Sequence, residues 1–424
     1  MPYIDTPPTT TPTPTKMTVP SPHPAYTQEL QIVQLAVQRA ALLTKRVLET
    51  LIKPTVTTPL TTTSPISQFL HHPSFPPTPQ DAAATAADPG SNPHLPRRFS
   101  LAKSDTSPVT IADLAAQALL ISAIHAAFPH DTILGEEDAS ALREDPHLLA
   151  QVWELVSTTR LEDEACEALL ARPGSAEDMM GVIEARGTGE SGRVWSLDPI
   201  DGTSAFLKGG QYAISVALIV GGREVVGVLG CPNLRVPAVG EEGWVVRETV
   251  HDVEGMGLML AAVRGHGATV RPMGRGALLE GRRVERGRGK GVELRDVHFV
   301  DSSRSPATLT EKVKALAGVI GAAYPAPTEL YSSHMRYAAM VLGGREFVQL
   351  RWPKPSKGPW SIWDHAGSQL IYTESGAGKV TDLDGNPINF TTGNKLSRSW
   401  GVITADESIH GKILELVREM RAAE

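Results

Sequence analysis

The stretch WSLDPIDGTSAF, from Trp195 to Phe206, constrains the fold of this chain more than any other part of the sequence. An apolar strand runs directly into Asp198 and Asp201, so both carboxylates leave the end of a strand and point into one small volume. Hard divalent cations such as Mg²⁺ prefer oxygen ligands in that arrangement. Pro199 fixes one backbone torsion, which allows the Ile200 carbonyl to be a third oxygen ligand. The pattern also fits a plain strand followed by an Asp/Gly turn, and other motifs must decide between the two.

The two residues after the second aspartate suit a phosphate group. Gly202 lets the backbone approach a ligand closely. A helix that begins there would offer its free N–H groups, including that of Thr203, as a cradle for an anion beside the metal ligands. A metal site next to a phosphate cradle is the minimal set of groups for phosphoryl hydrolysis. The stretch therefore indicates an enzyme that cleaves a phosphate ester.

The composition narrows the class of protein. The chain has 424 residues, 41% of them hydrophobic, which is enough for two domains with large cores. A net charge of −7 argues against a nucleic-acid partner, and no apolar run is long enough to cross a membrane. We therefore expect a monomer that acts on a small molecule. Only Cys166 and Cys231 are present, which predicts a reducing compartment: the cytoplasm, with the nucleus also open.

Two Pro/Thr-rich blocks interrupt the chain. Residues 1–26 and 54–102 bury too little apolar surface to offset the entropy lost on ordering, so we expect a disordered N-terminus and a disordered insertion. The rest divides into an α+β domain over residues 27–237, which includes the insertion, and an α/β domain over residues 238–424. Within the first domain, residues 148–171 read as helical and residues 172–192 as a loop.

Three further acidic residues lie where they could join a metal site: Asp113, Glu136 and Asp364. Asp113 stands in the first turn of a predicted helix, where the helix dipole alone would favour a carboxylate. Glu136 follows Gly135 at the end of a short strand, and such acidic clusters are usually solvated turns. His365, beside Asp364, could be a ligand, but a histidine there is more often a surface or hydrogen-bonded residue.

The motifs together resemble the inositol monophosphatase-like family of lithium-sensitive, Mg²⁺-dependent phosphatases. That family combines three motifs in this order: GEE at Gly135–Glu137, DPIDGT at Asp198–Thr203 and WDHAG at Trp363–Gly367. Within it the chain is similar to the fungal 3′(2′),5′-bisphosphate nucleotidases. The supporting stretches are AALLTKR, SPVTIADLAAQ, FLKGGQYAISVALIV and GCPNL. The resemblance covers residues 27–53 and 103–424 and implies a layered α-β-α-β-α sandwich of the inositol monophosphatase and sugar phosphatase type.

The resemblance also implies roles for residues of this chain. Two or three Mg²⁺ ions would be held by Glu136, Asp198, the Ile200 carbonyl, Asp201 and Asp364. Asp198 would bridge two of the ions, and a weaker third ion could share Glu136, which joins Asp113 and Thr203 in the catalytic set. Asp113, through Thr203, would orient and deprotonate the attacking water, so no covalent enzyme intermediate is needed. The backbone of Gly202 and Thr203 would hold the scissile phosphate.

A substrate pocket is implied in the second domain, which also supplies the last metal ligand. The second, non-reacting phosphate would be bound by Ser333, Arg336 and Arg351, since cationic side chains suit it. A His-Ser-Ser-His element near the adenine in the family is here Asp301-Ser302-Ser303-Arg304. Loss of the stacking histidine would weaken binding of the base unless Arg304 stacks in its place. The family's usual Lys-Gly after the central Asp-Gly-Thr is Ser204-Ala205 here.

The expected reaction is hydrolysis of the 3′-phosphate of adenosine 3′,5′-bisphosphate to AMP, with the sulfated analogue as a second substrate. Such an enzyme would clear a by-product of sulfate assimilation and would be inhibited by Li⁺. Two alternatives remain open at this point. One is an inositol mono- or polyphosphate phosphatase with the same chemistry. The other is a non-catalytic nucleotide or metal sensor, against which the intact set of acidic residues argues.

Overall fold

The structure is a computed structural model that describes residues 25–52, 100–102, 108–185, 192–236, 245–252, 255–284, 291–302, 307–326 and 328–423. Most of the expected disordered N-terminus and insertion lies outside these ranges, as does Arg304. The last three residues of that insertion form β1 (Ser100–Ala102), which pairs antiparallel with β2 (Pro108–Thr110).

A seven-stranded sheet carries the central motif. Its strands lie in the order β3 (Thr132–Gly135), β4 (Arg193–Asp201), β5 (Ala213–Val220), β6 (Arg223–Cys231), β7 (Leu258–Val263), β8 (Gly267–Pro272) and β9 (Arg282–Arg283). β3 and β4 are parallel, and every other pair is antiparallel. Gly221 and Gly222 both have positive φ and form the tight β5–β6 turn expected of a hairpin. Strands β7, β8 and β9 of this sheet lie after residue 237 in the chain. The boundary between two domains at residue 237 stays a prediction.

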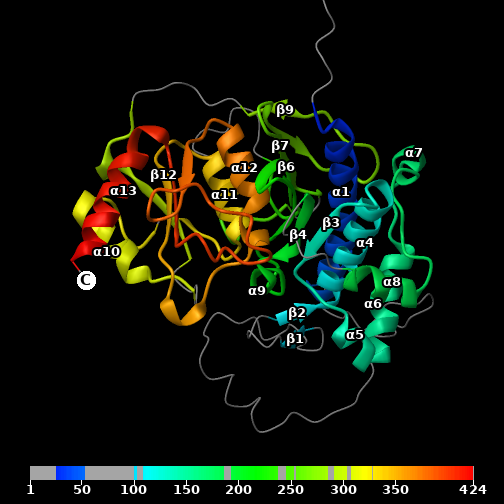
Figure 1. The fold of residues 1–424 in the computed structure, drawn as a ribbon. Coiled ribbons are helices and arrows are strands. Elements are labelled where there is room, and N and C mark those ends of the chain that lie inside the picture. The colour runs from blue at the N-terminus through cyan, green and yellow to red at the C-terminus, as the bar shows by residue number, and fades with distance from the viewer. Residues whose placement is uncertain are drawn as a thin grey trace, which may run out of the picture.

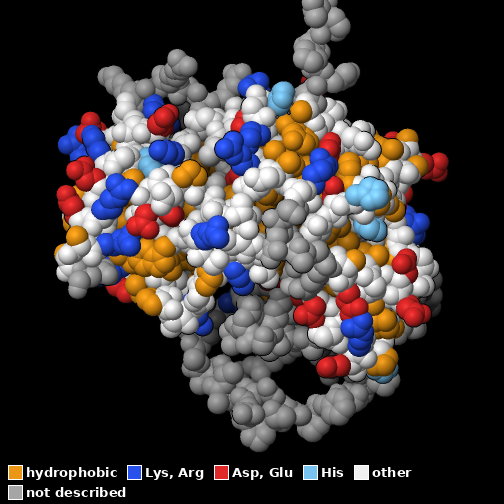
Figure 2. Space-filling view, in the orientation of Figure 1, with side chains coloured by type: hydrophobic (Ala, Val, Ile, Leu, Met, Phe, Trp, Pro, Cys, Tyr) orange, Lys and Arg blue, Asp and Glu red, His pale blue; other side chains and the backbone are white. Residues whose placement is uncertain are grey.

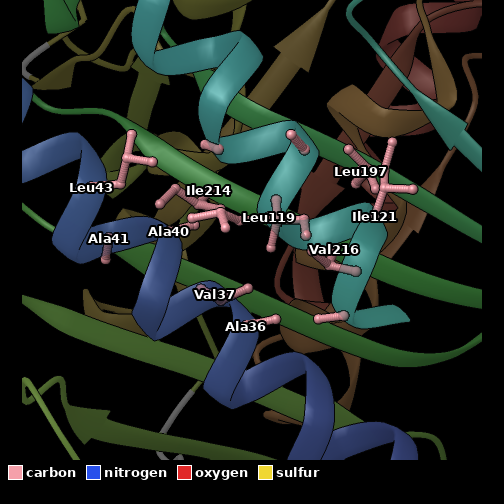
Figure 3. Close-up of a cluster of buried hydrophobic side chains, with 14 of the residues drawn as sticks. Ala36, Val37, Ala40, Ala41, Leu43, Leu119, Ile121, Leu197, Ile214 and Val216 are labelled. Atoms are coloured by element: carbon pink, nitrogen blue, oxygen red, sulfur yellow. The ribbon is translucent and has the colours of Figure 1, made fainter. Parts of the chain in front are cut away.

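Helices α1 (Thr27–Ile52) and α4 (Ile111–Ala127) cover one face of this sheet (Figure 1). Figure 3 shows their contact: Ala36, Val37 and Ala40 of α1 lie near Leu119 of α4, above Ile214 and Val216 of β5. The small alanines let the two helices approach each other and the sheet closely, which gives a dense core.

The segment after α4 differs from the sequence prediction. Instead of one helix over residues 148–171 and a loop over residues 172–192, it forms α5 (Ser140–Glu144), α6 (Pro146–Thr158), α7 (Glu164–Glu167) and α8 (Ala176–Glu184). Local caps explain the division, because the Asp163 side chain accepts from the Cys166 N–H and the Ser175 side chain from the Asp178 N–H. Capped helices this short carry too few turns for hydrophobic periodicity to reveal them.

A second sheet has five strands in the order β11 (Thr328–Glu329), β10 (His298–Asp301), β12 (Phe347–Arg351), β14 (Val402–Ala405) and β13 (Lys379–Thr381). Helices α11 (Ser333–Leu342) and α12 (Ala366–Glu374) lie between the two sheets, and α10 (Thr310–Ile320) and α13 (Glu407–Ala422) cover the outer face (Figure 1). The layers therefore run α-β-α-β-α, and the fold prediction is confirmed.

Short elements complete the description: α9 (Thr203–Phe206) and the 3-10 turns Leu294–Asp296, Pro355–Lys357 and Ile362–Asp364. Among the helices of the described ranges, none combines the length and the apolar character that a membrane span needs. On the face seen in Figure 2, the coloured lysine and arginine side chains are scattered among acidic ones.

Candidate active site

Asp198 and Asp201 lie on one face of the sheet because β4 is bulged between them. Residues three apart on a regular strand point to opposite faces. Here Asp198 pairs with Ser215 and Asp201 with Ala213, so β4 holds one more residue than β5 over this interval. The extra residue returns Asp201 to the face of Asp198. Asp364, at the end of the 3-10 turn before α12, completes a cluster in which one carboxylate oxygen from each aspartate lies within 4.8 Å of the others.

This triad fits a hard divalent cation. The Asp198 side chain is buried, and its Oδ1 atom has no hydrogen-bond donor among the described residues. Burial raises the pKa of Asp198 well above its usual value, and Glu136, Asp201, Asp364 and Asp113 raise it further. Burial also raises the pKa of Asp364 to about 7, although the Arg351 guanidinium opposes the shift. Carboxylates this close, with Asp198 buried, are costly unless a cation neutralises them, and oxygen donors suit Mg²⁺.

Glu136 and Asp113 lie close enough to the triad for their charges to act on it. Both carboxylates act on the pKa of Asp198, and Glu136 also acts on that of Asp364. Gln117 of α4 holds the turn that carries Glu136: its Nε2 donates to the Glu137 carbonyl at 2.8 Å and its Oε1 accepts from the Glu137 N–H at 2.9 Å. A Cβ atom at Gly135 would lie 2.7 Å from that amide, so a larger residue there would displace the Gln117 side chain that holds the turn.

The phosphate-cradle residues follow directly after β4. Gly202 has φ of 93° and precedes α9, and a Cβ atom there would lie 2.9 Å from Cβ of Ser332. The Thr203 hydroxyl donates to the Ile200 carbonyl at 3.2 Å. The predicted carbonyl ligand is thus also a hydrogen-bond acceptor for the side chain expected to orient water.

His334 links Asp201 to the segment that carries Asp364, and sequence reasoning missed it. Oδ2 of Asp201 accepts from the Ser332 hydroxyl at 2.5 Å and from the His334 N–H at 2.6 Å. The buried His334 ring lies 2.7 Å from Oγ of Ser368 and 2.8 Å from the Trp363 carbonyl, immediately before Asp364. A histidine in the first turn of a helix capped by Ser332 gave no signal of this role without the tertiary contacts.

Two buried arginines lie side by side next to the triad. The Ser333 hydroxyl accepts from Nη2 of Arg336 at 3.0 Å and from Nη1 of Arg351 at 3.2 Å. Nε and Nη1 of Arg336 and Nε of Arg351 are buried without an acceptor in the part of the chain that the structure describes. Burial lowers the pKa of Arg336 to about 10 and also lowers that of Arg351. Paired guanidinium groups with unused N–H donors suit an anion with several oxygens, such as a phosphate.

The remaining predicted pocket residue is Asp301, at the end of β10. It is buried, and its Oδ1 accepts from the Ser302 N–H at 2.7 Å. Burial raises the pKa of Asp301, while Arg336 and Arg351 lower it, which places the carboxylate beside the two arginines. Of the two expectations for His365, the hydrogen-bonded one is correct: the ring is fully buried, and burial, followed by Arg351, holds its pKa well below the usual value.

Comparison with known proteins identifies the family. The model of the family described as "Inositol monophosphatase family" matches residues 91–422. The chain belongs to the inositol monophosphatase family. As a member of that metal-dependent family, it carries an acidic triad able to hold an ion.

Three curated fungal proteins of related sequence align with most of this chain. It is 32% identical to a 3′(2′),5′-bisphosphate nucleotidase of Emericella nidulans, over 93% of this chain and 99% of the relative. The identity is 36% to the enzyme of that name from Schizosaccharomyces pombe, over 74% of this chain and 85% of the relative. The identity to 3′(2′),5′-bisphosphate nucleotidase 2 of Candida albicans is 32%, over 95% of this chain and 99% of the relative. The resemblance inferred from the motifs is confirmed.

Proposed function

We propose that the chain is a Mg²⁺-dependent 3′(2′),5′-bisphosphate nucleotidase. It hydrolyses the 3′-phosphate of adenosine 3′,5′-bisphosphate to AMP and converts the sulfated analogue to adenosine 5′-phosphosulfate. The names of the relatives support this substrate class. The observation that carries the proposal is the pair of buried arginines beside the acidic triad, because a substrate with two phosphates needs a second anion site next to the reacting one.

One set of groups in the site binds the metal ions, and a different pair, Asp113 and Thr203, transfers the proton. Mg²⁺ would be held by Glu136, Asp198, the Ile200 carbonyl, Asp201 and Asp364. When bound, two or three ions lower the pKa of water and stabilise the leaving oxygen. Asp113 accepts the proton of the attacking water through Thr203, and the N–H groups of Gly202 and Thr203 hold the scissile phosphate.

The second phosphate binds to Ser333, Arg336 and Arg351. The unused N–H donors of the two arginines supply charge-assisted hydrogen bonds to phosphate oxygens. Asp301 lies beside them, and we place the ribose and base next to Asp301 and Arg304, the second of which lies outside the described residues. Without this phosphate site, the same metal chemistry would serve an inositol phosphate equally well.

In the cell, such an enzyme clears a by-product of sulfate assimilation. We propose that it is a cytoplasmic monomer, present also in the nucleus, with no nucleic-acid or membrane partner. Inhibition by Li⁺ follows from membership in a lithium-sensitive family.

Release of inorganic phosphate from a panel of substrates tests the proposal. With Mg²⁺ present, we expect turnover of adenosine 3′,5′-bisphosphate at a kcat/KM at least about a hundredfold above that of inositol 1-phosphate, since two charge-assisted contacts are lost with the second phosphate. Equal or greater activity on inositol 1-phosphate would identify an inositol phosphatase instead. An inactive chain that still binds the nucleotide would identify a sensor.

A further inference from the structure

His365 is buried, and its ring contacts Arg351, one of the two arginines of the phosphate pocket. Its ring is fully enclosed, with Nε2 at 2.9 Å from Nη1 of Arg351 and Nδ1 at 3.2 Å from the hydroxyl oxygen of Tyr337. Trp360 lies beside it, with ring centroids 5.9 Å apart. The proposed function assigns this residue no role, although it stands next to the metal ligand Asp364.

The two hydrogen bonds determine which nitrogen of His365 carries the proton. An arginine side chain has donors and no acceptor, so Nε2 of His365 must accept the Arg351 N–H through its lone pair. The ring proton is therefore on Nδ1, where it is donated to the Tyr337 oxygen. A neutral ring in this tautomer is compatible with both contacts, whereas a doubly protonated ring would place a donor against a donor.

Arg351 is held from three directions. His365 accepts one Nη1–H, Ser333 accepts another at 3.2 Å, and the guanidinium carbon lies 4.3 Å from the centre of the Trp360 ring. Ser333 is shared with Arg336, so His365 is the acceptor in this set that serves Arg351 alone. These contacts orient the planar guanidinium and leave its buried Nε–H without an acceptor among the described residues. A rigid donor of this kind loses little rotamer freedom when an anion binds.

We propose that His365 is a positioning residue for substrate recognition: through its Nε2 lone pair it holds the Arg351 guanidinium in the orientation that binds the second, non-reacting phosphate. The inference rests on the proposed function, because it assigns that phosphate to Arg351. His365 thus sets affinity for doubly phosphorylated substrates and leaves the bond-breaking step unchanged.

A double-mutant cycle with adenosine 3′,5′-bisphosphate tests this assignment. His365→Leu removes the acceptor and should raise KM roughly tenfold, the loss expected for one hydrogen bond to a charged group, with kcat and the Mg²⁺ requirement unchanged. In an Arg351→Ala background the same change should have no further effect on KM, because the group it positions is already missing. His410→Leu is the matched control, since His410 is also buried and hydrogen-bonded, to Thr381, but lies on α13.

The possible results distinguish failure of the role proposed for His365 from failure of the proposed nucleotidase activity. Additive effects of the two substitutions, or a fall in kcat with unchanged KM, would overturn the role of His365 while leaving the nucleotidase assignment intact. A wild-type chain without activity on the bisphosphonucleotide would overturn both. If His365→Leu does not fold, a second pair decides: His365→Gln keeps an acceptor within reach and should retain the wild-type KM, whereas the shorter His365→Asn should raise it. Equal KM values for that pair would contradict the inference.

Discussion

Asp198 and Asp364 hold their protons more tightly than ordinary aspartates, and this gives the site a pH dependence. Burial raises both pKa values, that of Asp364 to about 7. Without a cation, the folded chain therefore binds more protons at Asp364 than the unfolded chain does between about pH 4 and 7, and Asp198 acts in the same direction. Stability contributed by the protonated carboxyls is present at the acidic end of this window and is lost as pH rises through the folded-state pKa.

Mg²⁺ should reverse this loss, since the ion replaces the protons. We expect the increase in Tm caused by saturating Mg²⁺, relative to EDTA, to be several degrees larger at about pH 7.5 than at about pH 5.5. Scanning calorimetry measures both increases on the same chain.

Asp201→Asn keeps an oxygen to accept from Ser332 and His334 but removes a charge from the triad, so it should lower the increase in Tm caused by Mg²⁺ at both pH values and abolish turnover. A Mg²⁺ effect independent of pH would refute the assignment of the triad as ligands.

At the scale of elements, α4 and the turn after β3 are joined by one side chain. Gln117→Met keeps the length of the side chain and removes both hydrogen bonds to the Glu137 backbone, which is buried. We expect a loss of roughly 1–3 kcal/mol in the free energy of unfolding, measured by urea denaturation. The Mg²⁺ concentration for half-maximal activity should also rise, since Glu136 then lies on a looser turn.

Ser122→Ala on the same helix is the control for Gln117. Among the described residues, its hydroxyl bonds only to the Ala118 carbonyl, one turn back, at 2.8 Å. This variant should lose less stability and keep the wild-type Mg²⁺ requirement. If both variants lose the same stability and neither changes the requirement, Gln117 has no special role in placing Glu136.

Elements also show where sequence reasoning succeeds and where it stops. The strand that carries Asp198, the hairpin β5–β6 and the helix after Asp364 were predictable, because local apolar patterns and turn residues specify them. The bulge that aligns Asp201 was not, since it depends on pairing with β5. Arg336 alone reads as a surface charge, and it is buried only because α11 lies between two sheets. The roles of His334 and His365 likewise arise from contacts across the layers.

At the scale of the whole molecule, the layered fold assembles the site from both sheets. The aspartates at the end of β4 come from the seven-stranded sheet, whereas Arg351 ends a strand of the five-stranded sheet. Between them, Glu248 joins the two parts: its Oε1 accepts from the Gln211 N–H at 3.0 Å, after α9, and its Oε2 from the Tyr331 N–H at 3.2 Å, before α11. Burial raises the pKa of the Glu248 carboxyl to about 7, because the group that joins the two parts is partly shielded from water.

Glu248→Ala should weaken the alignment of the two parts of the site. Both N–H groups lose their acceptor, and we expect a loss of roughly 1–3 kcal/mol in the free energy of unfolding, together with a higher KM for adenosine 3′,5′-bisphosphate, because Ser333 follows Tyr331 by two residues. Glu248→Gln keeps one carbonyl oxygen and should lie between wild type and Ala in both measurements. Thr249→Ala, at the exposed neighbouring position, is the control and should change neither. A normal KM in a destabilised Glu248→Ala variant would show that this link supports the fold alone and that other contacts align the phosphate pocket with the metal ligands.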